Sequence, residues 1–227
     1  MSYKIVVMSC DKNEDLWKPF YLCMEKYWKN HPEIIYSTET KVNPYYKTIC
    51  RNLSINQWTR RVYETCKLLD CKHVLLMVDD VFIRDYVCNT LVEVLCGFVS
   101  GGYAGLNMEK CFDMYDQPLT EKIMIRNQCG KYKTSLMCQL WQRNIMLELF
   151  NIDLNPWDFE KLNNGRYYRF LISRFGDFIN WGYQDRKWFG IKGGKWCKEI
   201  KEFFDKEGIE IDYSIRGFVE WKCIYVH

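Results

Sequence analysis

The chain has 227 residues, a formal net charge of +3, and 48% hydrophobic and 17% aromatic residues. A chain of this length can bury roughly 70% of its unfolded surface, so its core requires no disulfide or metal for stability. The apolar content excludes a disordered chain, and the small net charge argues against binding to a nucleic acid.

Cysteine usage and the N-terminal residues bear on the cellular compartment. Twelve cysteines are scattered without a CxxC pair, and many lie inside apolar runs, where cysteine behaves as a small hydrophobic residue. The opening residues, MSYKIVVMSC, have the pattern of a first strand and not of a signal peptide. No uninterrupted apolar segment approaches the ~18 residues of a membrane span. We therefore expect a reduced, cytoplasmic protein without a membrane span.

The first half of the sequence alternates between strand and helix patterns. Apolar runs of strand length lie at residues 4–9, 33–38, 73–78 and 103–108. Amphipathic helical periodicity begins at Asn13, at Ile55 and at about Val87, and the second of these helices is expected to reach about Leu69. This order predicts an α/β fold with a mostly parallel central sheet and helices on both faces.

The second half is less regular. Residues 110–142 resemble β structure, with turns at 116–118 and 129–130. The remaining predicted elements are helices at 143–150, from Pro156 and at about 196–206, and strands at 167–173 and 187–192. We expect one domain, 1–227, made of a regular α/β half (1–108) and an irregular, β-containing half (109–227).

One stretch, HVLLMVDDVFI (73–83), places two adjacent carboxylates directly after the most apolar predicted strand. Ligands of open α/β sheets bind beyond the carboxyl ends of the strands, where Asp79 and Asp80 would lie. An aspartate after a strand often belongs to a solvated turn. Because Val81, Phe82 and Ile83 are poor material for such a turn, the pattern favours an oxygen-ligand metal site for Mg²⁺ or Mn²⁺.

Three motifs carry a resemblance to a known family. MVDDVFI resembles the short acidic metal motif of GT-A-fold, nucleotide-sugar-dependent glycosyltransferases. SLMCQLWQRNIMLELF (135–150) followed by NPWDFE (155–160) is similar to a pattern of bacterial and viral polysaccharide glycosyltransferases, and GGKW (193–196) is a partial third match. Together the motifs cover residues 4 to about 200. The whole looks most like the small glycosyltransferase domains of large algal (chlorella) viruses, for which the host cytoplasm would be the location.

The resemblance implies a metal-dependent transferase that moves a sugar, such as a hexose, from a UDP-sugar to a glycan or glycoprotein acceptor. It would make 1–108 the nucleotide-binding half and 109–227 the acceptor-side half. Asp79 and Asp80 would bind Mn²⁺ or Mg²⁺, with Asp80 the direct ligand and Asp79 nearer the ribose or a metal-bound water. The other residues expected at the nucleotide sugar are Ser9, Cys10, Asp11, Thr38, Arg61, Lys192 and Lys195.

Several of these residues also have structural interpretations. Asp11 is equally suited to cap the helix that follows it. Lys192 and Lys195 flank Gly193-Gly194, which fits a plain β-turn with surface lysines as well as a diphosphate contact. Arg61 is expected near the edge of the apolar face of its helix, from which it would point toward the nucleotide.

An inverting transferase needs a base within hydrogen-bond reach of the attacking hydroxyl. The expected base is Asp158, with Glu160 second, because aromatic residues flank them as in a sugar-binding cleft. The alternative for Asp158 is structural, since Asn155 and Pro156 form a helix start at which an acid two residues after the proline supports the cap.

Two other functions are consistent with parts of the sequence. A non-catalytic carbohydrate-binding module would use the aromatic residues for stacking but would need no metal. A metal-dependent nucleotidyltransferase also combines an α/β sheet with acidic residues. It normally needs a glycine-rich loop after the first strand, and MSCDKNED (8–15) contains no glycine.

Overall fold

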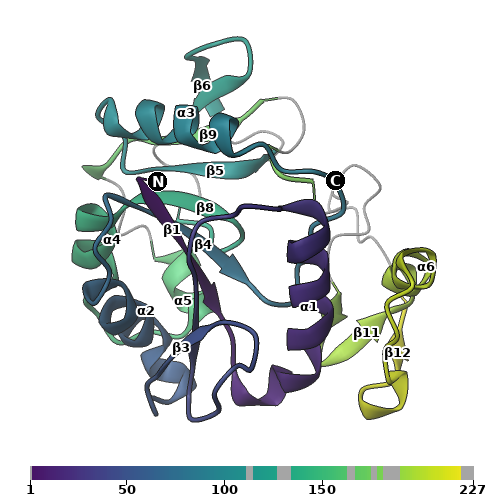
Figure 1. The fold of residues 1–227 in the computed structure, drawn as a ribbon. Helices are drawn as coiled ribbons and strands as arrows, with labels where there is room; N and C mark the ends of the chain where they lie inside the picture. The colour runs from purple at the N-terminus through teal and green to yellow at the C-terminus, as the bar shows by residue number, and fades with distance from the viewer. Residues whose placement is uncertain are drawn as a thin grey trace.

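The computed structural model of the chain describes residues 2–110, 115–126, 134–162, 167–174, 178–180 and 190–220. Its centre is a nine-stranded sheet in the order β3-β2-β1-β4-β8-β5-β9-β7-β6 (Figure 1). The strands are β1 (Tyr3–Met8), β2 (Ile34–Thr38), β3 (Lys47–Cys50), β4 (His73–Val78), β5 (Gly105–Lys110), β6 (Tyr115–Pro118), β7 (Ile123–Arg126), β8 (Gln139–Gln142) and β9 (Phe170–Ser173).

The core of the sheet is parallel, as the sequence predicted. β1 pairs in parallel with both β2 and β4, and β2 pairs in parallel with β3, an edge strand that the sequence pattern did not reveal. β8 enters between β4 and β5 and runs antiparallel to both. Consequently the residues that precede β8 lie at the same edge of the sheet as the carboxyl end of β4.

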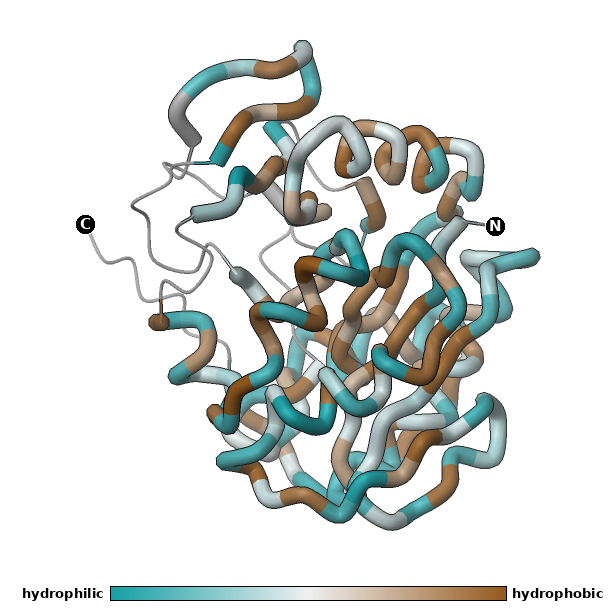
Figure 2. The backbone as a smooth tube through the Cα atoms, turned by 90° about the vertical axis from the view of Figure 1, so that its left-hand side faces the viewer, coloured by the Kyte–Doolittle hydropathy of each residue, from teal (hydrophilic) through white to brown (hydrophobic). Residues whose placement is uncertain are grey.

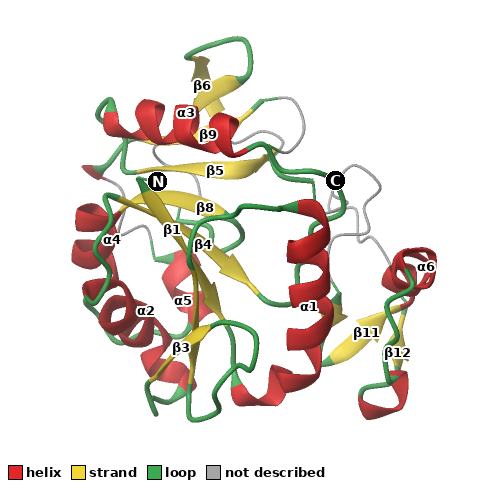
Figure 3. Ribbon diagram, in the orientation of Figure 1, coloured by secondary structure: helices red, strands yellow, loops and turns green. Residues whose placement is uncertain are grey.

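Helices cover both faces of the sheet (Figure 3). Side chains of β1 alternate between two buried clusters, with Ile5 and Val7 on one face and Val6 and Met8 on the other. The first cluster is closed by α1 (Glu14–Tyr27) and α3 (Asn89–Ser100). The second is closed by α2 (Trp58–Lys67), α4 (Arg143–Phe150) and α5 (Pro156–Lys161). The helices therefore alternate between hydrophobic and hydrophilic residues along their length (Figure 2).

Several predicted boundaries shift by a few residues. Short 3-10 helices, η1 (Asp11–Asn13) and η2 (Ile55–Gln57), precede α1 and α2, and α2 ends before Leu69. The helix predicted from Trp196 is α6 (Lys198–Glu207), because Trp196 belongs to a strand. It ends at Gly208, whose φ of 68° is the left-handed conformation of a helix cap. The turn predicted at 129–130 and residues 187–189 of a predicted strand lie outside the described residues.

Residues 190–220 form a small unit that packs beside α1 (Figure 1), here called the C-terminal unit. It contains a three-stranded sheet of β10 (Ile191–Lys192), β11 (Lys195–Cys197) and β12 (Phe218–Val219), together with α6 and η5 (Tyr213–Ile215). Phe82 anchors it, since its ring lies 6.2 Å from that of Trp196 and 4.9 Å from that of Phe204. The apolar residues after the acid pair therefore have a packing role.

Gly190 lies where this unit meets the acid pair, and it admits no side chain. A Cβ atom there would lie 2.2 Å from a carbon of the Phe82 ring and 3.0 Å from the carbonyl oxygen of Asp80. We expect Gly190→Ala to lower the free energy of unfolding by about 1–3 kcal/mol, the usual cost of overpacking. Chemical denaturation measures this change.

Gly97 provides the matched control because it lies within α3 and a Cβ atom there would meet nothing within 4 Å. Gly97→Ala should raise the free energy of unfolding by roughly 0.5–1 kcal/mol, since alanine favours a helix more than glycine does. Equal effects of the two substitutions would contradict the close approach at Gly190.

In the part of the chain that the structure describes, no helix is both long and apolar enough to cross a membrane.

Candidate functional site

The acid pair lies at the carboxyl edge of the parallel strands, where the direction of strand addition reverses. From β1 the chain adds β2 and β3 on one side and then β4 on the other. Open α/β sheets form their ligand-binding crevice at such a reversal. Because Met8 and Val78 are register partners, Ser9 and Asp79 leave the two strands side by side.

Asp79 is an internal acid whose two carboxylate oxygens are both occupied. Its side chain is only 2% exposed. Ser9 Oγ donates to Oδ2 at 2.5 Å, and Asn13 Nδ2 donates to Oδ1 at 2.9 Å. Trp17 Nε1 donates in turn to Ser9 Oγ at 2.8 Å. Asp79 therefore organises the loop after β1.

Asp80 differs from its neighbour. Its side chain is partly exposed, and within the described residues no other residue donates a hydrogen bond to its carboxylate. Its backbone carbonyl accepts a hydrogen bond of 2.7 Å from the amide of Gly190, which fixes the bend after β4 against the C-terminal unit. Of the two acids, Asp80 is the more exposed residue and the one whose carboxylate accepts no hydrogen bond from another described residue.

The electrostatics of the pair are those of two carboxylates in a poorly solvated place. Burial, with the charge of Asp80, raises the pKa of Asp79 to about 7. Burial also raises the pKa of Asp80 to about 6, although the positive charge of Arg216 acts in the opposite direction. A further cation at this place would favour the charged form of both groups.

The donor set fits Mg²⁺ or Mn²⁺. Among the described residues, no group of three or more His, Cys, Asp or Glu side chains could enclose a metal ion. Mg²⁺ needs no such cage, because it is usually bound by one or two carboxylates, water and the phosphates of a substrate. Asp80, with Asp79 beside it, provides this kind of partial, oxygen-only site.

Arg61 connects the ends of β1 and β2. Its guanidinium is 3% exposed and donates to the carbonyl of Ser9 at 2.8 Å and to the carboxylate of Glu39. Glu39 accepts a further hydrogen bond of 2.6 Å from the amide of Asp11. Arg61 therefore points to the edge of the sheet where the nucleotide was predicted, and it shapes that edge.

The other residues expected to bind the nucleotide at this edge also have local roles. Asp11 does not cap the helix, because its carboxylate accepts hydrogen bonds from the amides of Thr40 and Lys41. The hydroxyl of Thr38 is buried and donates to the carbonyl of Lys41 at 2.6 Å. Cys10 lies between Ser9 and Asp11, and burial raises the pKa of its thiol. A nucleotide contact from these residues stays a prediction.

Lys192 and Lys195 face each other across the β10–β11 hairpin. Gly193 and Gly194 form its turn with φ values of 58° and 80°, a conformation that favours glycine. Both lysine side chains are exposed. The hairpin follows Gly190, which contacts Asp80, so the fold brings the two lysines to the same region as the acid pair, where their contact with a diphosphate stays a prediction.

The two carboxylates expected to act as the base have different surroundings. Asp158 is exposed, and its amide and carboxylate both bond to the side chain of Asn155, so the predicted helix cap is confirmed. Glu160 is partly buried, accepts a hydrogen bond of 2.9 Å from the amide of Leu136, and has a pKa raised by burial. Leu136 precedes β8, so Glu160 lies at the edge of the sheet that carries the acid pair.

Three residues of this site were not identified from the sequence: Asn13, Asp15 and Arg216. Asn13 contacts Asp79 directly, and Arg216 contacts both Asn13 and Asp15. A polar residue shortly after a strand could have indicated Asn13. Arg216 is 201 residues from its partner Asp15, and no local pattern indicates such a contact.

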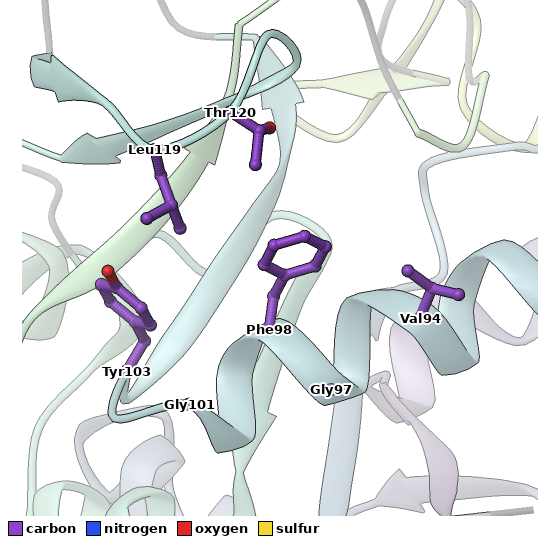
Figure 4. A pocket seen from close by; sticks show the side chains of 7 residues that line it. All are labelled: Val94, Gly97, Phe98, Gly101, Tyr103, Leu119 and Thr120. Atoms are coloured by element: carbon purple, nitrogen blue, oxygen red, sulfur yellow. The ribbon is translucent and has the colours of Figure 1, made fainter.

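A separate pocket of about 480 Å³ lies between α3 and the β6–β7 turn (Figure 4). Its lining is mainly apolar, with Val94, Phe98, Tyr103 and Leu119 around it. None of the residues expected to bind a nucleotide sugar or a metal lines this pocket.

Comparisons with known proteins support the fold. No protein-family model and no curated protein matches the chain. The structure of S. aureus TarS, a GT-A glycosyltransferase, is similar with a TM-score of 0.53 and 10% identity, over 79% of this chain and 36% of TarS. A shorter TarS fragment in complex with UDP-GlcNAc has a TM-score of 0.48 and 11% identity, over 78% of this chain and 56% of the fragment.

A cytidylyltransferase from Leptospira borgpetersenii is also similar, with a TM-score of 0.48 and 11% identity over 99% of both chains. At these identities the likeness concerns the fold alone. The chain has a mixed α/β fold with a large central sheet whose core is parallel, as its sequence predicted, and this fold is similar to that of TarS.

Proposed function

We propose that the chain is a metal-dependent glycosyltransferase that moves a sugar, such as a hexose, from a UDP-sugar to a glycan or glycoprotein acceptor. One observation carries the proposal. Asp80 is a partly exposed residue at the carboxyl end of a central parallel strand, beside an internal acid that holds the loop after β1. A binding module would have no use for two carboxylates whose pKa values are raised by burial.

In this proposal Asp80 would hold Mn²⁺ or Mg²⁺, with Asp79 positioned behind it. The bound ion would supply charge neutralisation for the departing nucleoside diphosphate. The chain itself contributes Lys192 and Lys195, which would extend positive charge toward the diphosphate from the β10–β11 hairpin. Ser9, Cys10 and Asp11 would contact the base and ribose from the end of β1.

The acceptor hydroxyl needs a base, and its surroundings favour Glu160 over Asp158. Asp158 is already engaged by Asn155 in the cap of α5. Burial raises the pKa of Glu160, so its carboxylate is a stronger proton acceptor than an exposed one. Glu160 would take the proton of the attacking hydroxyl. A single carboxylate in that role fits a direct displacement at the anomeric carbon.

The proposal is tested by calorimetric titration of the whole chain with UDP and UDP-glucose, first in Mn²⁺ and then in EDTA. Binding of both ligands in Mn²⁺ and its loss in EDTA are the expected results. Preference for CTP over UDP would contradict the proposal and favour a nucleotidyltransferase. Absence of binding to any nucleotide, together with binding to glycans in EDTA, would favour a carbohydrate-binding module.

The cellular location and the likeness to algal-virus domains stay predictions from the sequence. Immunoblotting of fractions from the source cell would test the first of these.

A further inference from the structure

Arg216 reaches the candidate site from the far end of the described chain. It follows η5 in the C-terminal unit, and its side chain is 10% exposed. Its Nε and Nη2 atoms donate to the two carboxylate oxygens of Asp15 at 2.7 and 2.5 Å. Nη2 also donates to the carbonyl of Lys12 at 2.7 Å. These contacts fix the guanidinium over the segment that connects β1 to α1.

The same guanidinium determines which way the Asn13 amide faces. Arg216 Nη2 donates to Asn13 Oδ1 at 3.1 Å, and Asn13 Nδ2 donates to Asp79 Oδ1 at 2.9 Å. A guanidinium can only donate, and a carboxylate can only accept. Asn13 must therefore turn its oxygen to Arg216 and its amino group to Asp79.

The chain of contacts continues through Asp79. Its second carboxylate oxygen accepts from Ser9 Oγ at 2.5 Å, and Trp17 Nε1 donates to that hydroxyl at 2.8 Å. The orientation of Asp79 is thus determined from two sides, by Ser9 and by Asn13. Asp80 follows directly, so the contacts that hold Asp79 also hold the backbone from which the Asp80 side chain leaves, together with the hydrogen bond from Gly190 to the Asp80 carbonyl.

Arg216 also contributes charge. Its guanidinium lies close enough for its positive charge to act on the carboxylates of both Asp79 and Asp80. Asp15 already neutralises much of that charge through its two hydrogen bonds. The directional contact with Asn13 is therefore the feature that distinguishes Arg216 from any other cation near the pair.

We propose that Arg216 is a positioning residue of the donor site: through Asn13 it orients Asp79, and thereby places Asp80 for the metal and nucleotide. The inference rests on the proposed function for its consequence in binding. Its geometric part, the path from Arg216 through Asn13 and Asp79 to Ser9 and Trp17, holds without a ligand. Partners that orient a metal ligand typically contribute about 10- to 100-fold to metal affinity.

The test compares Arg216→Lys and Asn13→Ala, singly and combined, with Lys26→Met as the matched control. Lysine keeps the charge but lacks the fork of donors that reaches Asp15 and Asn13 together. Lys26 pairs with Glu207 and also joins α1 to the C-terminal unit, but it does not contact the acid pair. Calorimetry measures the Kd of UDP in Mn²⁺, and thermal unfolding reports whether each variant folds.

Arg216→Lys and Asn13→Ala are each expected to weaken UDP binding by roughly 10- to 100-fold. The Kd of the double variant should not exceed that of whichever single variant binds UDP more weakly. Lys26→Met should bind as the wild type does. Additive effects of the two substitutions would overturn the proposal, because residues on one path share one effect. An equal loss in Lys26→Met would also overturn it, because docking of the C-terminal unit would then be the whole cause.

A second measurement needs no nucleotide. The ¹⁵N-indole resonance of Trp17, identified by its loss in Trp17→Phe, should move in Arg216→Lys and Asn13→Ala and stay unchanged in Lys26→Met. If the wild type binds no UDP, the proposed function fails, while a moved resonance still supports the positioning path. A resonance that Arg216→Lys leaves unchanged would overturn the inference whatever the protein binds.

Discussion

Asp80→Asn is expected to abolish metal-dependent binding of UDP. The substitution keeps the shape of the side chain and removes the carboxylate of the more exposed acid of the pair. Because Asp80 would be the direct ligand, the loss of affinity in Mn²⁺ should exceed the roughly 100-fold that removal of an orienting partner costs. Calorimetric titration with UDP in Mn²⁺ measures it.

The fold of this variant should be intact. Burial disfavours the charged form of Asp80 and raises its pKa to about 6, so an uncharged side chain suits this place at least as well. We therefore expect the unfolding midpoint of Asp80→Asn, measured in EDTA, to equal or exceed that of the wild type. Full UDP affinity in a folded Asp80→Asn variant would show that Asp80 does not bind the metal and that the acid pair has only a structural role.

Glu160→Gln is expected to lower kcat by about 10²–10⁴-fold with little change in KM, the usual contribution of a general base. Glutamine preserves the hydrogen bond from the amide of Leu136 but accepts no proton. Steady-state kinetics with a UDP-sugar and a glycan acceptor measure the change, after the donor has been identified by the binding experiment.

The pH profile gives an independent result. A base must be deprotonated, so kcat falls as pH drops through the pKa of Glu160. Burial raises that pKa above the ordinary glutamate value of about 4.3, and the acidic limb should lie correspondingly higher. Glu160→Gln should lose this limb. If Glu160 only accepted a hydrogen bond and did not act as the base, Glu160→Gln would keep the acidic limb of the kcat profile.

Asp158→Asn is the matched control for this experiment. The change is equally conservative, and Asp158 lies two residues away in the same helix. The asparagine oxygen can still accept from Asn155, and the cap from Asn155 to the amide of residue 158 is kept, so we expect little change in stability and a kcat close to that of the wild type. A large fall in kcat for Asp158→Asn with none for Glu160→Gln would exchange the two roles.

The apolar residues that follow the acid pair are buried, and part of the cause lies in a distant segment of the chain. The apolar character of Val81, Phe82 and Ile83 argues against a solvated turn, and all three are buried. Phe82 packs against the C-terminal unit, where its ring contacts those of Trp196 and Phe204. The sequence between them contains more than a hundred residues, so no local pattern could reveal that contact.

Local chemistry determined much of the fold without reference to distant residues. The strand at 73–78 is apolar at every position after His73, which predicts a central strand, and Asn155-Pro156 defines a helix start through contacts within three residues. These features depend on backbone hydrogen bonding and on alternation of polarity, both of which act between near neighbours. The two acids lie at the end of this strand because they directly follow it in the sequence.

Only the tertiary structure decided which members of the site act together. It buried Asp79 under Ser9 and Asn13 and left Asp80 partly exposed, a difference in burial that two adjacent aspartates do not reveal by themselves. It inserted β8 antiparallel beside β4, so that Leu136, whose amide donates to Glu160, precedes the strand that borders β4. It also carried Arg216 onto Asp15 and Asn13. Such contacts depend on how layers pack across the whole chain, and packing between distant segments leaves no periodic signal in the sequence.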